Sequence, residues 1–311
     1  MFVVIIFLLF LTSCSTTTKT SEPMVAVPND IEVKEKAPVI IDEQSSNEPT
    51  TIEIPGHSMA KKPAIALIFG PGLNRTAGYS AFLKALKRHN ISAQMVSGSG
   101  MGAIIAAYYA SGETPQKIEW LFFKFFNETK GKKPYSRSWQ KSLEEVFLKE
   151  FKDTQIQDLK IPLVIPVFQK NPPMIKNFSQ GSVFQLLKAQ FNFSFKGKEQ
   201  FISPLEKQVF NGVWMRTLGA EIVIGVDALG KNLLLEDEDV FLRDHLTKVS
   251  KIIKKDKKYL DLFFTLPFSD MPLDSDKKLP ESLQKTGEYG VWAANIIKSK
   301  RDLRKNHEDE D

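Results

Sequence analysis

The sequence is poor in the residues that build disulfides and metal sites. It has one cysteine, Cys14, so no disulfide can form within the chain. Its four histidines show no metal-ligand spacing with each other or with a carboxylate cluster; they are His57, His89, His245 and His307. A phosphate-binding loop is also missing, because no lysine follows Gly70-Pro71-Gly72 at the required distance. The sequence therefore predicts neither a metal nor a cofactor.

Long apolar runs are equally scarce. Met1–Ser13 is apolar but too short to span a bilayer, which indicates the hydrophobic part of a signal peptide. Leu11-Thr12-Ser13-Cys14 resembles the lipobox of bacterial lipoproteins, in which the cysteine is diacylated and becomes the new N-terminus. No lysine or arginine precedes the run, so an ordinary signal peptide with an incidental cysteine is the alternative. Lipidation of Cys14 would hold the protein in the cell envelope, and Ser15 favours the outer membrane by the same resemblance.

The segment that follows is predicted to be a disordered tether, spanning 14–60 with the lipidated cysteine. Five prolines interrupt it and no helix or strand period persists. Its three lysines against eight acidic residues give a net charge of −5, while the whole chain carries +5. Residues 61–311 are therefore strongly basic. A basic domain held at a membrane would be attracted to anionic headgroups. A positively charged surface that is merely solvated explains the charge equally simply.

From Pro63 onward, short apolar runs alternate with amphipathic segments. The expected strands are 64–69, 91–96, 161–168 and 220–227. The expected helices are 81–89, 103–110, a helix capped by Thr114 with Pro115 in its first turn, and 182–191. Strands that alternate with helices predict an α/β fold with a mostly parallel sheet covered on both faces.

The most informative segment is Val96–Ala103, VSGSGMGA. An apolar approach, a glycine-rich turn and a small-residue helix are the context of a nucleophile elbow, G-x-S-x-G, which presents a serine at a helix N-terminus. Gly98 and Gly102 match the outer glycines of this elbow. Gly100, however, stands at the serine position, and the nearest hydroxyl, Ser99, is one residue out of register.

Four segments resemble the patatin-like phospholipases, in the order that this family has them. They are 65–86 (IALIFGPGLNRTAGYSAFLKAL), 98–112 (GSGMGAIIAAYYASG), 178–193 (FSQGSVFQLLKAQFNF) and 210–227 (FNGVWMRTLGAEIVIGVD). A weaker fifth match runs over 262–297. The resemblance implies a patatin-like three-layer α/β/α domain over 61–300, followed by a charged tail at 301–311.

The resemblance also implies where the family's catalytic groups would lie. The family uses a Ser–Asp dyad and a glycine-rich oxyanion loop; the nucleophile position here is Gly100 and the base position is Asn211. An amide accepts no proton at neutral pH. In the loop at 71–76, only Gly72 and Arg75 match the family pattern, and Pro71 lacks the N–H of the residue it replaces. Three altered parts together predict that hydrolysis has been lost.

We therefore expect a membrane-anchored lipoprotein that is catalytically inactive and binds a phospholipid, an acyl chain or an envelope protein, and not nucleic acid. The alternative is a phospholipase A-type acyl hydrolase in which Ser99 is a shifted nucleophile. That hydrolase would need a base from elsewhere, and Asp227 is the nearest candidate along the chain.

A basic run between Lys248 and Lys258 is a separate feature. Its six lysines are interleaved with Val249, Ile252 and Ile253 near helical spacing. This pattern predicts an amphipathic surface helix that meets acidic lipid or a partner. The solvated face of a packed helix is the simpler alternative.

Overall fold

The structure, a computed structural model, describes residues 64–193 and 198–308. The predicted signal peptide, Cys14, the tether and the last residues of the predicted tail lie outside these ranges. Within the described ranges, no helix is both long and apolar enough to cross a membrane.

The described residues form a seven-stranded, mostly parallel sheet with the order β4-β3-β2-β1-β6-β7, while β5 pairs with β3. The strands are β1 (Ile65–Phe69), β2 (Met95–Gly98), β3 (Leu163–Gln169), β4 (Met174–Phe178), β5 (Phe201–Ile202), β6 (Ile222–Asp227) and β7 (Leu262–Thr265). The pairs β1–β2, β1–β6, β2–β3 and β6–β7 are parallel, whereas β4 and β5 run antiparallel to β3. The predicted α/β fold with a mostly parallel sheet is confirmed.

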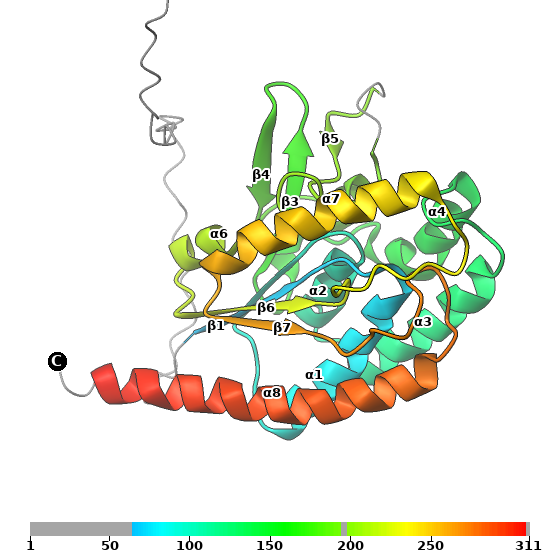
Figure 1. Ribbon diagram of the computed structural model, residues 1–311. Coiled ribbons are helices and arrows are strands. Elements are labelled where there is room, and N and C mark those ends of the chain that lie inside the picture. Colours follow the sequence, from blue (N-terminus) through cyan, green and yellow to red (C-terminus); the bar gives the residue numbers. More distant parts are fainter. Residues whose placement is uncertain (1–63, 194–197, 309–311) are drawn as a thin grey trace, which may run out of the picture. The chain divides into compact units, whose positions relative to one another are not determined.

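Helices cover both faces of this sheet, and Figure 1 shows α7 on one face with α1 and α8 on the other. The helices are α1 (Gly78–Arg88), α2 (Met101–Ala110), α3 (Pro115–Thr129), α4 (Arg137–Leu143), α5 (Val183–Ala189), α6 (Gly212–Thr217), α7 (Val240–Asp256) and α8 (Leu279–Glu308). Short 3-10 turns include η1 (Leu73–Ala77) and η5 (Lys257–Tyr259). As predicted, the Thr114 side chain caps α3 by accepting a hydrogen bond from the N–H of Lys117.

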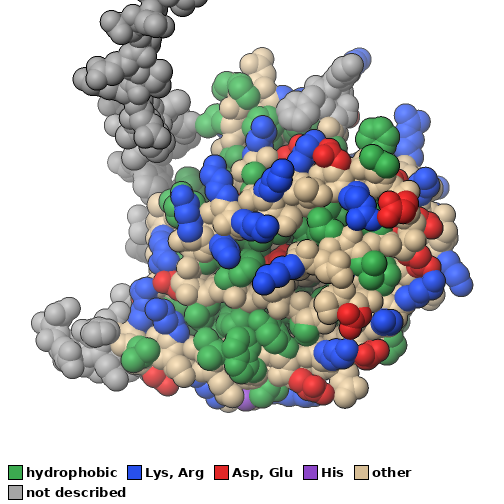
Figure 2. Space-filling model, viewed as in Figure 1, with side chains coloured by type: hydrophobic (Ala, Val, Ile, Leu, Met, Phe, Trp, Pro, Cys, Tyr) green, Lys and Arg blue, Asp and Glu red, His purple; other side chains and the backbone are tan. Residues whose placement is uncertain are grey.

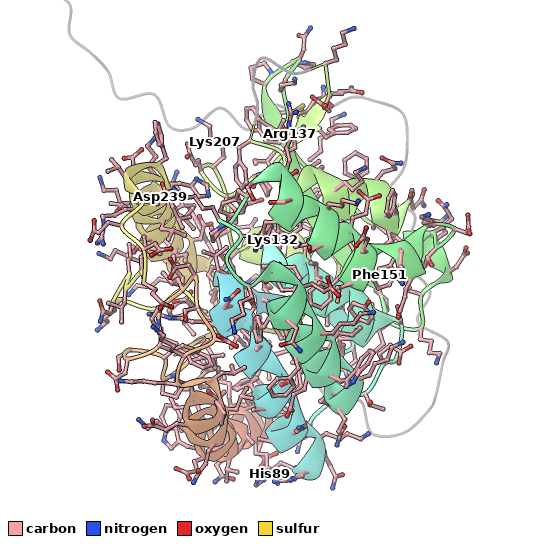
Figure 3. All side chains as sticks on the ribbon, turned by 90° about the vertical axis from the view of Figure 1, so that its right-hand side faces the viewer. His89, Lys132, Arg137, Phe151, Lys207 and Asp239 are labelled. Carbon is pink, nitrogen blue, oxygen red and sulfur yellow. The ribbon has the colours of Figure 1, made fainter. Side chains whose placement is uncertain are left out.

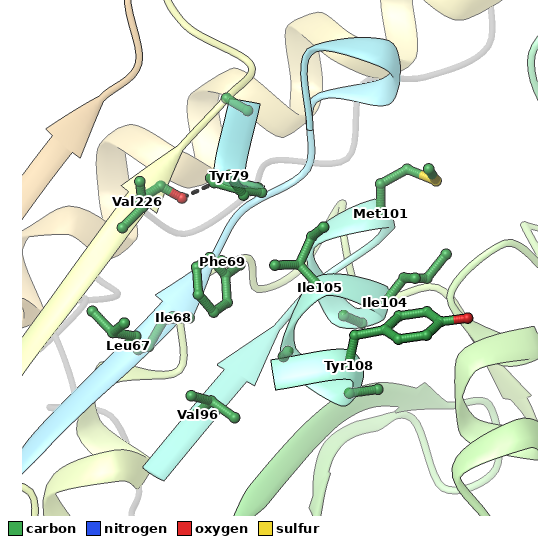
Figure 4. Packing of buried hydrophobic residues seen from close by; sticks show 14 of the residues in the cluster. Leu67, Ile68, Phe69, Tyr79, Val96, Met101, Ile104, Ile105, Tyr108 and Val226 are labelled. Carbon is green, nitrogen blue, oxygen red and sulfur yellow. Dashed lines mark hydrogen bonds between the residues drawn. The ribbon is translucent and has the colours of Figure 1, made fainter. Parts of the chain in front are cut away.

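The core lies where α2 packs against β1 and β2 (Figure 4). All five residues of β1 are buried, as the continuous apolar run predicts for a central parallel strand. Tyr79 of α1 ties this core to β6, because its hydroxyl donates to the carbonyls of Gly70 and Val226 at 2.9 and 2.8 Å. The C-terminal ends of β1, β2 and β6 therefore meet the start of α2 in a tightly packed layer.

One predicted strand boundary was wrong for a physical reason. The strand expected from Ile91 begins only at Met95, although exposure alternates over 91–94 as in a strand. The N–H of Ile91 instead donates to the carbonyl of Leu86 at the end of α1, and the N–H of Ala93 donates to the Tyr109 hydroxyl. At the other end, α8 continues to Glu308, so the predicted charged tail begins inside a helix.

Candidate functional site

The turn between β2 and α2 has the backbone of a nucleophile elbow. β2 ends at Gly98, α2 begins at Met101, and Gly100 is the N-cap residue with φ 58° and ψ −132°. L-amino acids with side chains rarely adopt a positive φ, so the apex favours glycine unless the surrounding structure enforces strain. The predicted strand–turn–helix frame is therefore present, with no side chain at its apex.

The two outer glycines are required by packing alone. A Cβ atom on Gly98 would lie 2.3 Å from the carbonyl oxygen of Gly102, and one on Gly102 would lie 2.2 Å from the carbonyl oxygen of Phe69. Both distances are far below a van der Waals contact. Gly98 and Gly102 thus let α2 approach the end of β1, and they would be needed whether or not the elbow carries out chemistry.

Three side chains close the space above the apex. A Cβ on Gly100 would lie 3.3 Å from a methyl of Leu205 and 3.4 Å from Cβ of Pro71, and all three residues are buried. The N–H of Gly100 donates to Oε1 of Gln190 at 2.9 Å, and Nε2 of Gln190 donates to the Pro166 carbonyl at 2.7 Å. We call Leu205, Pro71 and Gln190 the apex plug, because they pack against or bind the apex glycine.

Ser99 lies below the apex and is fully buried. Its hydroxyl donates to the carbonyl of Val209 at 2.8 Å. Among the described residues, no carboxylate or imidazole is hydrogen-bonded to it. The nearby Asp256 carboxylate instead accepts the N–H groups of Val209 and Phe210, at 2.7 and 3.0 Å. The geometry thus gives Ser99 a structural partner and no general base.

The base position is also built into the structure as an amide. Asn211 is fully buried at the start of α6, and its Nδ2 donates to Oδ1 of Asn177 on β4 at 3.0 Å. Its Oδ1 finds no hydrogen-bond partner among the described residues. The side-chain amides of Asn211 and Asn177 are thus joined directly.

The segment at the oxyanion-loop position is a structural clamp. Residues 73–77 form the 3-10 turn η1, and a Cβ on Gly72 would lie 2.6 Å from Cβ of Ala228. The buried Arg75 donates from Nε to the Met271 carbonyl at 2.7 Å, and from Nη1 to the carbonyls of Leu229 and Asn232 at 2.7 and 2.9 Å. Burial lowers the pKa of Arg75 to about 10. The two matching loop residues therefore hold the loops after β6 and β7 together.

Asp227 ends β6 and caps the turn that follows. Its carboxylate accepts the N–H of Leu229 at 3.0 Å and that of Gly230 at 3.1 Å. Burial raises the pKa of Asp227 to about 6, against the opposing effects of these two N–H groups and of Arg75. No hydrogen bond joins Asp227 to Ser99 among the described residues.

The raised pKa predicts a pH dependence of stability. A carboxyl with a folded pKa above its unfolded value stabilises the native state most when it is protonated, and this contribution is lost as the pH rises through the folded pKa. We expect the free energy of unfolding of the native protein, relative to Asp227→Asn, to fall between about pH 4 and pH 7, by roughly 3 kcal/mol. Urea denaturation of both proteins at four pH values measures this. A difference that grows with pH would show that the ionised carboxylate is the favoured form.

An apolar cavity of about 410 Å³ lies beside the plug. Ser203, Glu206 and Lys207, which flank Leu205 in the chain, form part of its wall. Figure 3 shows Lys207 near Asp239, where α7 begins. The remaining wall is largely aromatic and aliphatic, and includes Tyr135, Phe168, Phe193, Ile202, Phe241 and Leu242. The rings of His245, Tyr135 and Phe193 contact one another, and Nδ1 of His245 lies 2.9 Å from Oε1 of Glu206.

Sheet, turn and loop together define an α/β protein in which a glycine stands at the apex of the turn between β2 and α2. Residues 67–203, from β1 into the segment after β5, match the family model of the patatin-like phospholipases. This part of the chain is therefore a patatin-like phospholipase domain, as the sequence indicated. The match ends before Asn211, so the base position rests on the sequence resemblance.

Solved structures provide a second comparison. VipD from Legionella pneumophila is 11% identical, with a TM-score of 0.45, over 78% of this chain and 67% of VipD. The type III effector ExoU is 14% identical, with a TM-score of 0.38, over 78% of this chain and 54% of ExoU. In another structure, ExoU of Pseudomonas aeruginosa is in complex with SpcU, at 12% identity, a TM-score of 0.35, and 75% and 53% coverage. This chain spans about half the length of ExoU.

Proposed function

We propose that this protein is a patatin-like lipoprotein of the cell envelope that binds an acyl lipid without hydrolysing it. The observation that supports this most directly is the closed elbow apex. Gly100 supplies no nucleophile, Leu205 and Pro71 cover it, and its N–H is bound by Gln190. A Ser–Asp hydrolase needs an attacking oxygen, a base and free N–H donors at this one place, and each of the three is replaced by a structural contact.

The ligand is proposed to occupy the cavity beside the plug. Its aromatic and aliphatic wall suits a hydrocarbon chain, which gains free energy in proportion to the apolar area it buries. The charged groups at its mouth have both signs: Lys248 pairs with Asp244 at 2.8 Å, and Lys207 lies in the same wall as Glu206 and Asp239. Lys207 also lies over the ring of Phe168, 5.9 Å from its centroid, which keeps the cation close to the apolar wall.

A fluorophosphonate probe tests the loss of hydrolysis. We expect no labelling of the wild-type chain or of Ser99→Ala, because the Ser99 hydroxyl is buried and bonded to a carbonyl. A serine esterase in the same tube serves as the positive control. Labelling of the wild type that disappears in Ser99→Ala would instead support the shifted-serine hydrolase.

The same preparation is expected to bind a fluorescent fatty acid. Lys207→Glu places a negative charge at the cavity and should weaken this binding about tenfold, an effect of the size of one desolvated charge contact. Lys152→Glu makes the same change at an exposed site away from the cavity and should leave the affinity unchanged. Equal affinities in the two variants would rule out this cavity as the lipid site.

A further inference from the structure

Basic and aromatic side chains gather where α6 meets the end of α7. The 3-10 turn η5 follows α7 directly, and the start of α6 packs on it: a Cβ on Gly212 would lie 2.7 Å from the Tyr259 carbonyl and 3.0 Å from a methyl of Leu260. We call this surface the α6–α7 corner. It consists of Val213, Trp214, Lys251, Lys254, Lys255, Lys257, Lys258 and Tyr259, all of them exposed.

The lysines of the corner point outward and are unpaired. Leu246, Val249 and Ile253 hold the opposite side of α7 in the core. None of the five lysines forms an ion pair with a carboxylate in the described ranges. The first half of α7 differs, since Arg243 pairs with Glu238 at 2.8 Å and Lys248 with Asp244 at 2.8 Å. Figure 2 shows Lys and Arg side chains along α7 with few acidic side chains among them.

The corner also exposes apolar and aromatic side chains. Trp214 and Tyr259 are each 40% exposed and Val213 is 54% exposed. The ammonium of Lys258 lies 4.8 Å from the centre of the Tyr259 ring, so cationic and apolar groups are interleaved. Next to the corner, the Asp261 carboxylate forms two ion pairs. Its Oδ2 lies 2.8 Å from Nη2 of Arg216 on α6, and its Oδ1 lies 3.3 Å from Nη2 of Arg304 on α8. These ion pairs fix the base of α6.

We propose that the α6–α7 corner docks on the surface of an anionic bilayer. Tryptophan and tyrosine favour the interface between headgroups and acyl chains, and lysine can lie over apolar surface while its ammonium stays with the headgroups. The lysines spread along the helix from 251 to 258 and do not converge on one point, which suits an extended negative surface better than a single bound anion. A solvated face would need neither the exposed tryptophan nor an excess of unpaired lysines.

The point at which the described chain begins agrees with this orientation. The carbonyl of Ala64 accepts the N–H groups of Glu221 and Ile222, at 2.9 and 3.1 Å, just after α6. The described chain thus begins beside the strand that follows α6. The residues that precede Ala64 are numerous enough for the corner to reach a membrane that would hold an acylated Cys14. The docking does not depend on the closed elbow.

Vesicle co-sedimentation tests the proposal. The unacylated chain beginning at Cys14, which keeps every described residue, is mixed with phosphatidylglycerol–phosphatidylcholine vesicles or with phosphatidylcholine alone. We expect binding to the anionic vesicles only, and its loss at high salt. Lys254→Gln, Lys255→Gln and Lys258→Gln together should lower the partition coefficient about a hundredfold, at about fivefold for each lysine.

A matched variant controls for net charge. Lys87→Gln, Lys133→Gln and Lys152→Gln remove the same charge from exposed sites on other elements, and should change the partition coefficient less than fourfold. Trp214→Ala should weaken binding severalfold with an unchanged circular dichroism spectrum. Equal loss in both triple variants would reduce the effect to overall charge and overturn the proposal. So would equal binding to neutral vesicles, or none to anionic ones.

Discussion

Gly102→Ala is expected to lower the free energy of unfolding by about 3 kcal/mol or more. The new methyl would lie 2.2 Å from the carbonyl oxygen of Phe69 and 2.4 Å from that of Gly70. Both atoms belong to the backbone at the end of β1, so no side-chain rotation relieves the overlap. The start of α2 must move away from the central strand, which disturbs the packing shown in Figure 4. Urea denaturation followed by circular dichroism measures the change.

Gly287→Ala is the matched control within the same chain. Gly287 lies inside α8, and a Cβ there meets no atom within 4 Å. Alanine has the higher helix propensity, so this variant should be more stable than the wild type by about 0.5–1 kcal/mol. The same substitution is thus expected to lower the free energy of unfolding at position 102 and to raise it at position 287. A Gly102→Ala protein of wild-type stability would show that the elbow glycines are not packing requirements.

Arg75→Met is expected to lower the free energy of unfolding by about 3–5 kcal/mol. Methionine has a similar volume but donates nothing, so it leaves the carbonyls of Met271 and Leu229 without their buried donor. It also removes the positive charge that acts on the buried carboxylate of Asp227. Thermal and urea denaturation give the size of the loss.

The charge of Asp227 allows a second measurement on the same variant. Without Arg75, the pKa of Asp227 should rise further, and the loss of stability with increasing pH should extend above pH 6. Arg137→Met, at an exposed position on α4, is the control and should stay within about 0.5 kcal/mol of the wild type. Equal stability of the two variants would show that the hydrogen bonds of Arg75 contribute nothing to the stability of the fold.

Much of the fold could be predicted from the sequence, because buried parallel strands are continuous apolar runs. Ile65–Phe69 and Ile222–Asp227 are such runs, and both were predicted within two residues. β4 was missed: its residues, Met174–Phe178, are only half buried and include a lysine and an asparagine, so no apolar run marks it. The antiparallel hairpin that it forms with β3 depends on pairing, which local sequence does not reveal.

Only those residues of the candidate site that belong to a sequence motif could be predicted. Gly98, Gly100 and Gly102 stand at fixed spacing, and Arg75 follows Gly72 in a recognisable loop. Leu205 and Gln190 could not be found in this way, because a leucine and a glutamine carry no signal by themselves and they meet Gly100 only after folding. The glycines of the turn and Arg75 were therefore visible in the sequence, while the residues packed against Gly100 were not.

The apex plug has a consequence for any attempt to install a nucleophile in this turn. Because Leu205 and Pro71 pack over the apex and Gln190 binds the Gly100 N–H, a serine introduced at position 100 would add strain and would stay buried. The segments around Pro71, Gln190 and Leu205 would all have to change before such a serine could meet a lipid. The turn between β2 and α2 therefore cannot be re-engineered one residue at a time.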